Sequence, residues 1–67
     1  MTAQIVEFNP EYLKIWSGTP KGEEALFFFV SYFFPDGGEL IVHDGPTEAE
    51  ARQVAFEWGN IPVIVRL

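Results

Sequence analysis

Apolar and aromatic side chains fill almost every position of residues 25–34, "ALFFFVSYFF", instead of alternating with polar ones. In one β-strand, this run puts apolar groups on both faces of a sheet. The turn sequence "FPDGG" then predicts a β-hairpin to a second strand at 39–43, because proline presets the first turn residue and glycine takes the left-handed position of a bulged three-residue loop. Both faces of this hairpin need cover from water.

The predicted turn also sets the register of the two strands, with Phe33 opposite Glu39 and Phe29 opposite His43. Opposed residues share a sheet face. One face is then almost wholly apolar and suited to a core, whereas the other mixes aromatic and polar groups. The first face carries Leu26, Phe28, Val30, Tyr32, Phe34, Leu40 and Val42, and the second carries Phe27, Phe29, Ser31, Phe33, Glu39, Ile41 and His43.

Residues 47–58 have the pattern of an amphipathic helix. Thr47 is followed three residues later by Glu50, which forms a capping box at the helix start, and Gly59 ends the helix as a left-handed cap. Phe56 lies outside the apolar stripe, so it is either an exposed phenylalanine or part of a second contact. The stripe itself consists of Ala51, Val54, Ala55 and Trp58.

Residues 10–17, "PEYLKIWS", fit two structures. As a helix, the segment could cover the second face of the hairpin, whereas as a strand it leaves that face open. A strand is favoured, because so short an element has little helical stability of its own. Further strands are expected at 61–67, with Pro62 near the start where a missing N–H does least harm, and at 4–8.

These elements predict one small domain. A chain of 67 residues has room for a single thin core, and its hydrophobic content of 48% and aromatic content of 16% argue against disorder. We expect an α+β domain over residues 1–67, with an antiparallel-rich, mixed sheet of about four strands and one helix, about 47–58, packed on one face.

The amino-acid composition narrows the cellular environment and the classes of binding partner that we expect. The chain has no cysteine, which excludes disulfides and thiolate metal sites and favours a reducing, cytoplasmic environment. Its first residues lack a secretory signal, and its longest apolar run is too short to cross a membrane as a helix. The net charge of −6 repels nucleic-acid phosphates and anionic membranes but suits a basic protein partner. We expect neither direct nucleic-acid binding nor membrane association.

Few residues could carry catalysis or hold a cofactor. His43 is the only histidine, and no serine or cysteine nucleophile pattern accompanies it. The acidic residues lack the spacing of a calcium site, and one histidine without cysteine cannot build a structural zinc site. Trp16 and Trp58 are expected to pack in the core instead of on a ligand. We therefore predict a protein that is not an enzyme and that has no cofactor or metal.

The mixed face of the hairpin suggests a function in protein association, because a soluble protein rarely keeps a contiguous apolar patch without a partner. A homodimer covers such a face most simply, since a two-fold axis supplies a self-complementary surface. As alternatives, the chain's own N-terminal segment, a different protein or a ligand could cover this face. The predicted interface has Phe27, Phe29, Phe33 and Ile41 as anchors, with Glu39 and His43 at its rim.

Two further hypotheses are an acidic inhibitor or decoy and a small-ligand carrier. The decoy would occupy the basic groove of a nucleic-acid-binding protein, and it requires the carboxylates to cluster on one surface. The carrier would use the aromatic face as a platform for its ligand. The order of the elements, with the capped "PTEAEA" helix, resembles that of many small bacterial and phage proteins, a resemblance of architecture that implies no function.

Overall fold

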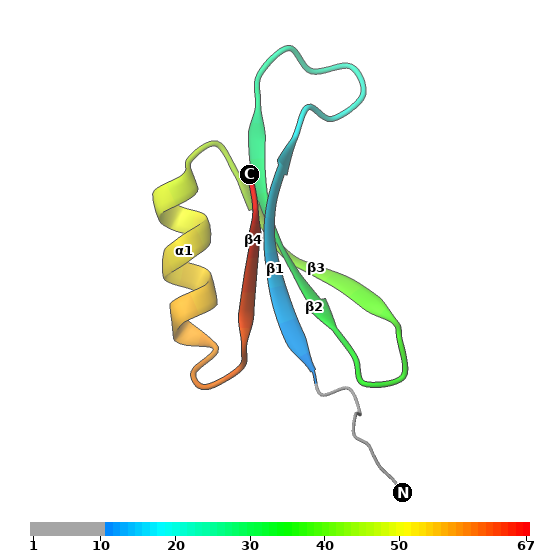
Figure 1. Ribbon diagram of the computed structural model, residues 1–67. Helices are drawn as coiled ribbons and strands as arrows, with labels where there is room; N and C mark the ends of the chain where they lie inside the picture. Colours follow the sequence, from blue (N-terminus) through cyan, green and yellow to red (C-terminus); the bar gives the residue numbers. More distant parts are fainter. Residues whose placement is uncertain (1–10) are drawn as a thin grey trace, which may run out of the picture.

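A four-stranded mixed sheet with one helix on it forms the structure, a computed structural model that describes residues 11–67. This is the α+β arrangement that the sequence predicts. The strand order is β3-β2-β1-β4, in which β1 pairs antiparallel with β2 and parallel with β4, and β2 pairs antiparallel with β3. The strand expected at 4–8 lies outside the described residues. The elements are β1 (Tyr12–Gly18), β2 (Phe27–Phe33), β3 (Glu39–Gly45), α1 (Glu48–Glu57) and β4 (Val63–Arg66) (Figure 1).

The segment that fits either a helix or a strand is a strand, β1, as favoured from the sequence. Its side chains alternate between the two faces of the sheet, as the pleat of a strand requires. Leu13 and Ile15 are buried on the face that α1 covers, and Tyr12, Lys14 and Trp16 point to the other face. The segment therefore widens the sheet instead of covering its second face.

The hairpin between β2 and β3 has the predicted turn. The N–H of Gly37 donates to the carbonyl of Phe34 at 2.9 Å, and the N–H of Phe34 donates to the carbonyl of Gly38 at 2.8 Å. Gly37 has a φ of +103°, the left-handed conformation that the sequence pattern assigns to it. Asp36 closes the turn, because its Oδ1 accepts a hydrogen bond from the N–H of Gly38 at 3.1 Å.

A β-bulge in β3 changes the register that the turn alone predicts. The pairs next to the turn are as expected, and Ser31 lies opposite Ile41. Beyond the bulge, Val30 pairs with His43 instead of Val42. Val42 is the extra residue, and it packs against the core beneath α1.

The prediction that His43 lies at the rim of the second face is therefore wrong. Because His43 is opposite the core residue Val30, its side chain points to the face that α1 covers. Its Nε2 lies 3.2 Å from the place of a Cβ on Gly45, beside the carboxylate of Glu50 at the helix start. Asp44, which pairs with Phe29, takes the position predicted for His43 on the second face.

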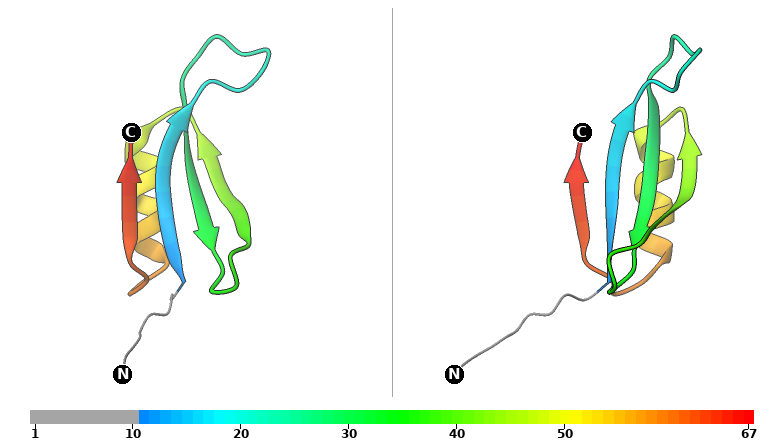
Figure 2. Two further views of the ribbon diagram at one scale, coloured as in Figure 1. Left: turned by 45° about the vertical axis from the view of Figure 1, so that its right-hand side comes forward. Right: turned by 90° about the vertical axis from the view of Figure 1, so that its right-hand side faces the viewer.

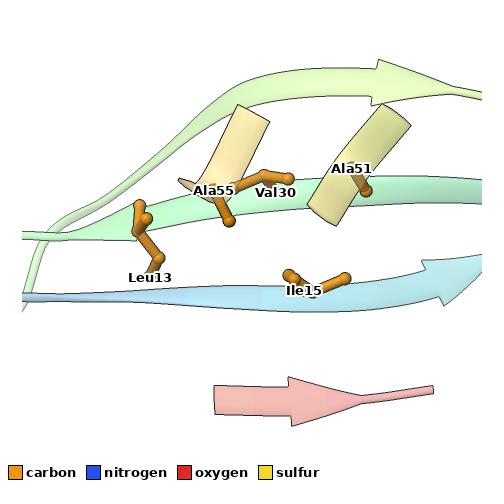
Figure 3. Packing of buried hydrophobic residues seen from close by; sticks show 5 residues of the cluster. All are labelled: Leu13, Ile15, Val30, Ala51 and Ala55. Atoms are coloured by element: carbon orange, nitrogen blue, oxygen red, sulfur yellow. The ribbon is translucent and has the colours of Figure 1, made fainter. Parts of the chain in front are cut away.

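The helix has the predicted caps. The side chain of Thr47 accepts a hydrogen bond from the N–H of Glu50 at 3.2 Å, and Gly59 follows the helix with a φ of +86°. Phe56 is 78% exposed, which supports its interpretation as a phenylalanine outside the buried stripe. The core that α1 forms with the sheet consists of Leu13, Ile15, Val30, Ala51 and Ala55 (Figure 3).

One helix covers less of the sheet than the sequence predicts. A helix of ten residues is about 15 Å long, whereas a strand of seven residues spans about 23 Å. Three residues assigned to the covered face, Leu26, Phe34 and Leu40, are therefore between 42 and 53% exposed. Trp58 is also outside the buried core, although its ring stacks on Tyr32 at the end of the helix.

Replacing Gly37 with alanine is expected to lower the free energy of unfolding by about 1–2 kcal/mol, because a Cβ disfavours the left-handed conformation of this turn residue. Urea titration monitored by circular dichroism measures the change. Gly38→Ala is the matched control, since Gly38 has no positive φ and a Cβ there meets Asp36 and Phe34 at ordinary distances of 3.5 Å. Equal losses in both variants would contradict the turn assignment.

Candidate functional site

The sheet face opposite α1 is the candidate functional site, and we call it the open face. The helix lies on one side of the sheet only, and no helix or strand within residues 11–67 packs on the open face (Figure 2). Besides Gly18, the register of the strands places twelve residues on it. They are Tyr12, Lys14, Trp16, Phe27, Phe29, Ser31, Phe33, Glu39, Ile41, Asp44, Ile64 and Arg66.

Two pairs of stacked rings form the centre of the open face. Tyr12 and Phe33 lie opposite each other on β1 and β2, with their ring centroids 4.6 Å apart and an angle of 5° between the ring planes. Trp16 and Phe29 form a second cross-strand pair, with 4.3 Å between centroids and an angle of 20°. Each ring covers one side of its partner, so the rings are half-buried and direct their edges outward.

Polar groups fill the space between the two stacks. Ser31 is fully buried, and its hydroxyl accepts a hydrogen bond from Nε1 of Trp16 at 2.8 Å. The Nζ of Lys14 lies 5.8 Å from the ring centroid of Trp16 and 5.4 Å from that of Phe33, within the range of cation–π attraction. The open face is therefore an ordered surface in which every aromatic stack has a polar neighbour.

Two rows of open-face residues cross all four strands. We call the row Asp44–Phe29–Trp16–Arg66 the charged row, because it has a carboxylate on β3 at one end and a guanidinium on β4 at the other. The next row, which we call the isoleucine row, is Ile41–Ser31–Lys14–Ile64. Both isoleucines are exposed, at 51% for Ile41 and 37% for Ile64.

The charges of the open face are separated by sign. The cations Lys14 and Arg66 lie on β1 and β4, whereas the carboxylates of Glu39 and Asp44 lie on β3 at the opposite edge of the sheet. The aromatic side chains of β2 lie between the two groups. The open face thus has no net charge in a chain of net charge −6.

The structure brings most of the predicted interface residues together. Phe27, Phe29 and Phe33 lie on the open face with Ile41 and Glu39, as the register predicts, whereas His43 does not. The side chains of β1 were not assigned to this face from the sequence. The prediction that Trp16 packs in the core is wrong, because Trp16 stacks on Phe29 on the open face. The alternation of Tyr12, Lys14 and Trp16 was the signal for these three residues, and Asp44 was missed because the bulge moves it.

Enclosed sites and ligand clusters are the next features to consider in the described part of the chain. Residues 11–67 enclose no pocket and contain no cluster of three or more potential metal ligands. No helix among them is long and apolar enough to cross a membrane. Tyr32, on the helix side, donates a hydrogen bond to Glu11; this bond, desolvation and the negative charge of Glu11 raise the pKa of its hydroxyl. The open face therefore offers apolar contact and charged groups.

Replacing Trp16 with phenylalanine is expected to destabilise the monomer, because the buried hydroxyl of Ser31 loses its hydrogen-bond donor. In a double-mutant cycle with Ser31→Ala, we expect a coupling energy of about 1 kcal/mol between the two side chains. Urea unfolding followed by circular dichroism measures all four proteins. A coupling energy near zero would contradict the structural role of this hydrogen bond, since the loss would then come from ring packing alone.

No protein-family model, curated protein or solved structure matches this chain. A function is therefore inferred from the geometry and charges of the open face.

Proposed function

We propose that the chain is a non-catalytic association module that binds a second copy of itself through the open face. The observation that carries the proposal is an aromatic sheet face that no element of residues 11–67 covers. The half-buried rings and the exposed Ile41 and Ile64 give this face several apolar groups around Ser31 and Lys14. Surfaces of this kind favour association, because contact with a partner removes the ring edges from water.

Charge makes a second copy an acceptable partner. Two chains of net charge −6 repel each other over most of their surfaces. The open face is an exception, because its two cations and two carboxylates balance. Contact through this face therefore brings together the least repulsive parts of the two molecules, and a two-fold axis makes the contact self-complementary.

The acidic decoy receives less support from the structure. A mimic of a phosphate backbone needs its carboxylates in one array. Here the carboxylates are spread over the β1–β2 connection, the β2–β3 hairpin at the other end of the sheet, β3 and the helix (Figure 1). Glu7 lies outside the described residues. The carboxylates concerned are Glu11 before β1, Glu23 and Glu24 in the connection, Asp36 in the hairpin, Glu39 and Asp44 on β3, and Glu48, Glu50 and Glu57 on α1.

A small-ligand carrier also fits the open face less well than a protein partner does. A flat ligand that stacks on a sheet needs ring faces turned toward it. In both stacks of the open face, each ring instead turns one face to its cross-strand partner. The part of the chain that the structure covers also encloses no pocket that would surround a ligand.

Phe29→Glu is expected to weaken self-association at least about tenfold while the chain stays folded, because dimer contact would bury an unpaired carboxylate in the middle of the charged row. Sedimentation velocity over a range of concentrations measures the association, and circular dichroism confirms folding. Phe33→Glu, in the other stack, is expected to act in the same direction.

Phe56→Glu is the matched control for these variants. It adds the same charge to an aromatic position, but Phe56 is 78% exposed on the helix and far from the open face in the fold. Its sedimentation should equal that of the original chain. A folded Phe29→Glu protein with unchanged sedimentation, or an equal loss in Phe56→Glu, would refute association through the open face.

A further inference from the structure

The two outer strands of the open face carry complementary groups at matching positions. Arg66 on β4 and Asp44 on β3 end the charged row, and Ile64 and Ile41 end the isoleucine row. Because β3 and β4 are the opposite edges of the sheet, these groups cannot meet within one molecule. They can meet between two molecules whose sheets face each other in the right orientation.

We infer that the second copy is related to the first by a two-fold axis that runs parallel to the strands and lies between β1 and β2. This inference rests on the proposed function and specifies the geometry of the contact. The axis keeps each residue at its level along the strands and reverses the strand order. The strand β4 of each copy then lies over β3 of the other, and β1 lies over β2.

In this arrangement, the ends of each row meet complementary groups. Arg66 lies over Asp44 of the second copy, and the same ion pair forms a second time by symmetry. Ile64 lies over Ile41 of the second copy, so that both exposed isoleucines are covered. Sheets that pack face to face keep their strands within about 30° of each other, so the rows stay approximately opposed.

The inner strands bring aromatic and small side chains together. Trp16 lies over Phe29 of the second copy, which sets the two aromatic stacks edge against edge. Lys14 lies over Ser31, the smallest side chain of the open face, so the sheets can approach at this point. The two Lys14 side chains then lie on either side of the axis, about one strand spacing of 4.8 Å apart in the plane of the sheets, so they are a like-charge contact of this arrangement.

The other two-fold arrangement is electrostatically unfavourable. A two-fold axis that runs parallel to the sheets but perpendicular to the strands places β3 of one copy over β3 of the other. It also reverses the order of the residues along the strands. Asp44 then lies near Glu39 of the second copy, and Arg66 has no carboxylate opposite it. Like charges across a contact cost free energy in any pair, and here they would add to the repulsion between two chains of net charge −6.

Cross-linking distinguishes the two axes, and the absence of cysteine from the chain makes the test simple. Ile41→Cys and Ile64→Cys are made separately, and each is treated with a bismaleimide that spans the roughly 10 Å between packed sheets. We expect a cross-linked dimer from a mixture of the two variants and little from either variant alone. The perpendicular axis instead predicts cross-linked dimers from Ile41→Cys alone and no larger yield of dimer from the mixture. That result would overturn the inference.

Charge reversal tests the same arrangement in solution. Asp44→Arg and Arg66→Asp should each weaken the dimer about tenfold at low salt, because each places like charges at both symmetry-related contacts. The double variant should recover the original affinity. At about 1 M salt, where the screening length is about 3 Å, the differences should disappear.

These results separate the inference from the proposed function. If Phe29→Glu dissociates the dimer but the double charge variant does not recover it, the open face associates in another arrangement and this inference fails alone. If the chain sediments as a monomer at every concentration, both the proposed function and the inference fail.

Discussion

One helix of ten residues must stabilise a four-stranded sheet, and it can cover only one face of it. The core depends on Leu13, Ile15 and Val30 meeting two alanines of the helix. Because successive side chains of a strand point to opposite faces, the strands that supply this core also present a second set of side chains on the other side. The open face is thus a direct consequence of how the core is built, and its composition decides whether the molecule remains soluble alone.

The open face contributes to the stability of the monomer as well as to its association. A stacked aromatic pair is worth about 0.5–1.5 kcal/mol beyond the area that it buries. The two stacks and the hydrogen bond from Trp16 to Ser31 therefore help to hold β1 against β2. Because the rings already shield each other, a partner gains less free energy from covering them than it would from fully exposed phenylalanines. The orientation of the second copy then depends more on the exposed residues that end the charged row and the isoleucine row.

Local sequence signals predicted the parts of the fold that are set locally. The helix N-cap at Thr47, the left-handed glycines and the hairpin register next to the turn all depend on residues close together in the chain. The bulge at Val42 has no such signal, because no glycine or proline marks it, and its position reflects packing beneath the helix. For the same reason, the sequence predicted Phe27, Phe29, Phe33, Ile41 and Glu39 on the open face and exchanged His43 for Asp44.

That exchange has an electrostatic consequence. In an unbulged strand, His43 would end the row that contains Arg66, and this row would have no carboxylate. With the bulge, the imidazole turns toward the helix, where its Nε2 has no hydrogen-bond partner among the described residues, and Asp44 completes the charged row. A buried unpaired nitrogen costs free energy, whereas the extra residue Val42 packs against the core, and the same bulge creates opposite charges at the two edges of the open face. Packing beneath the helix thereby determines the electrostatic pattern on the far side of the sheet.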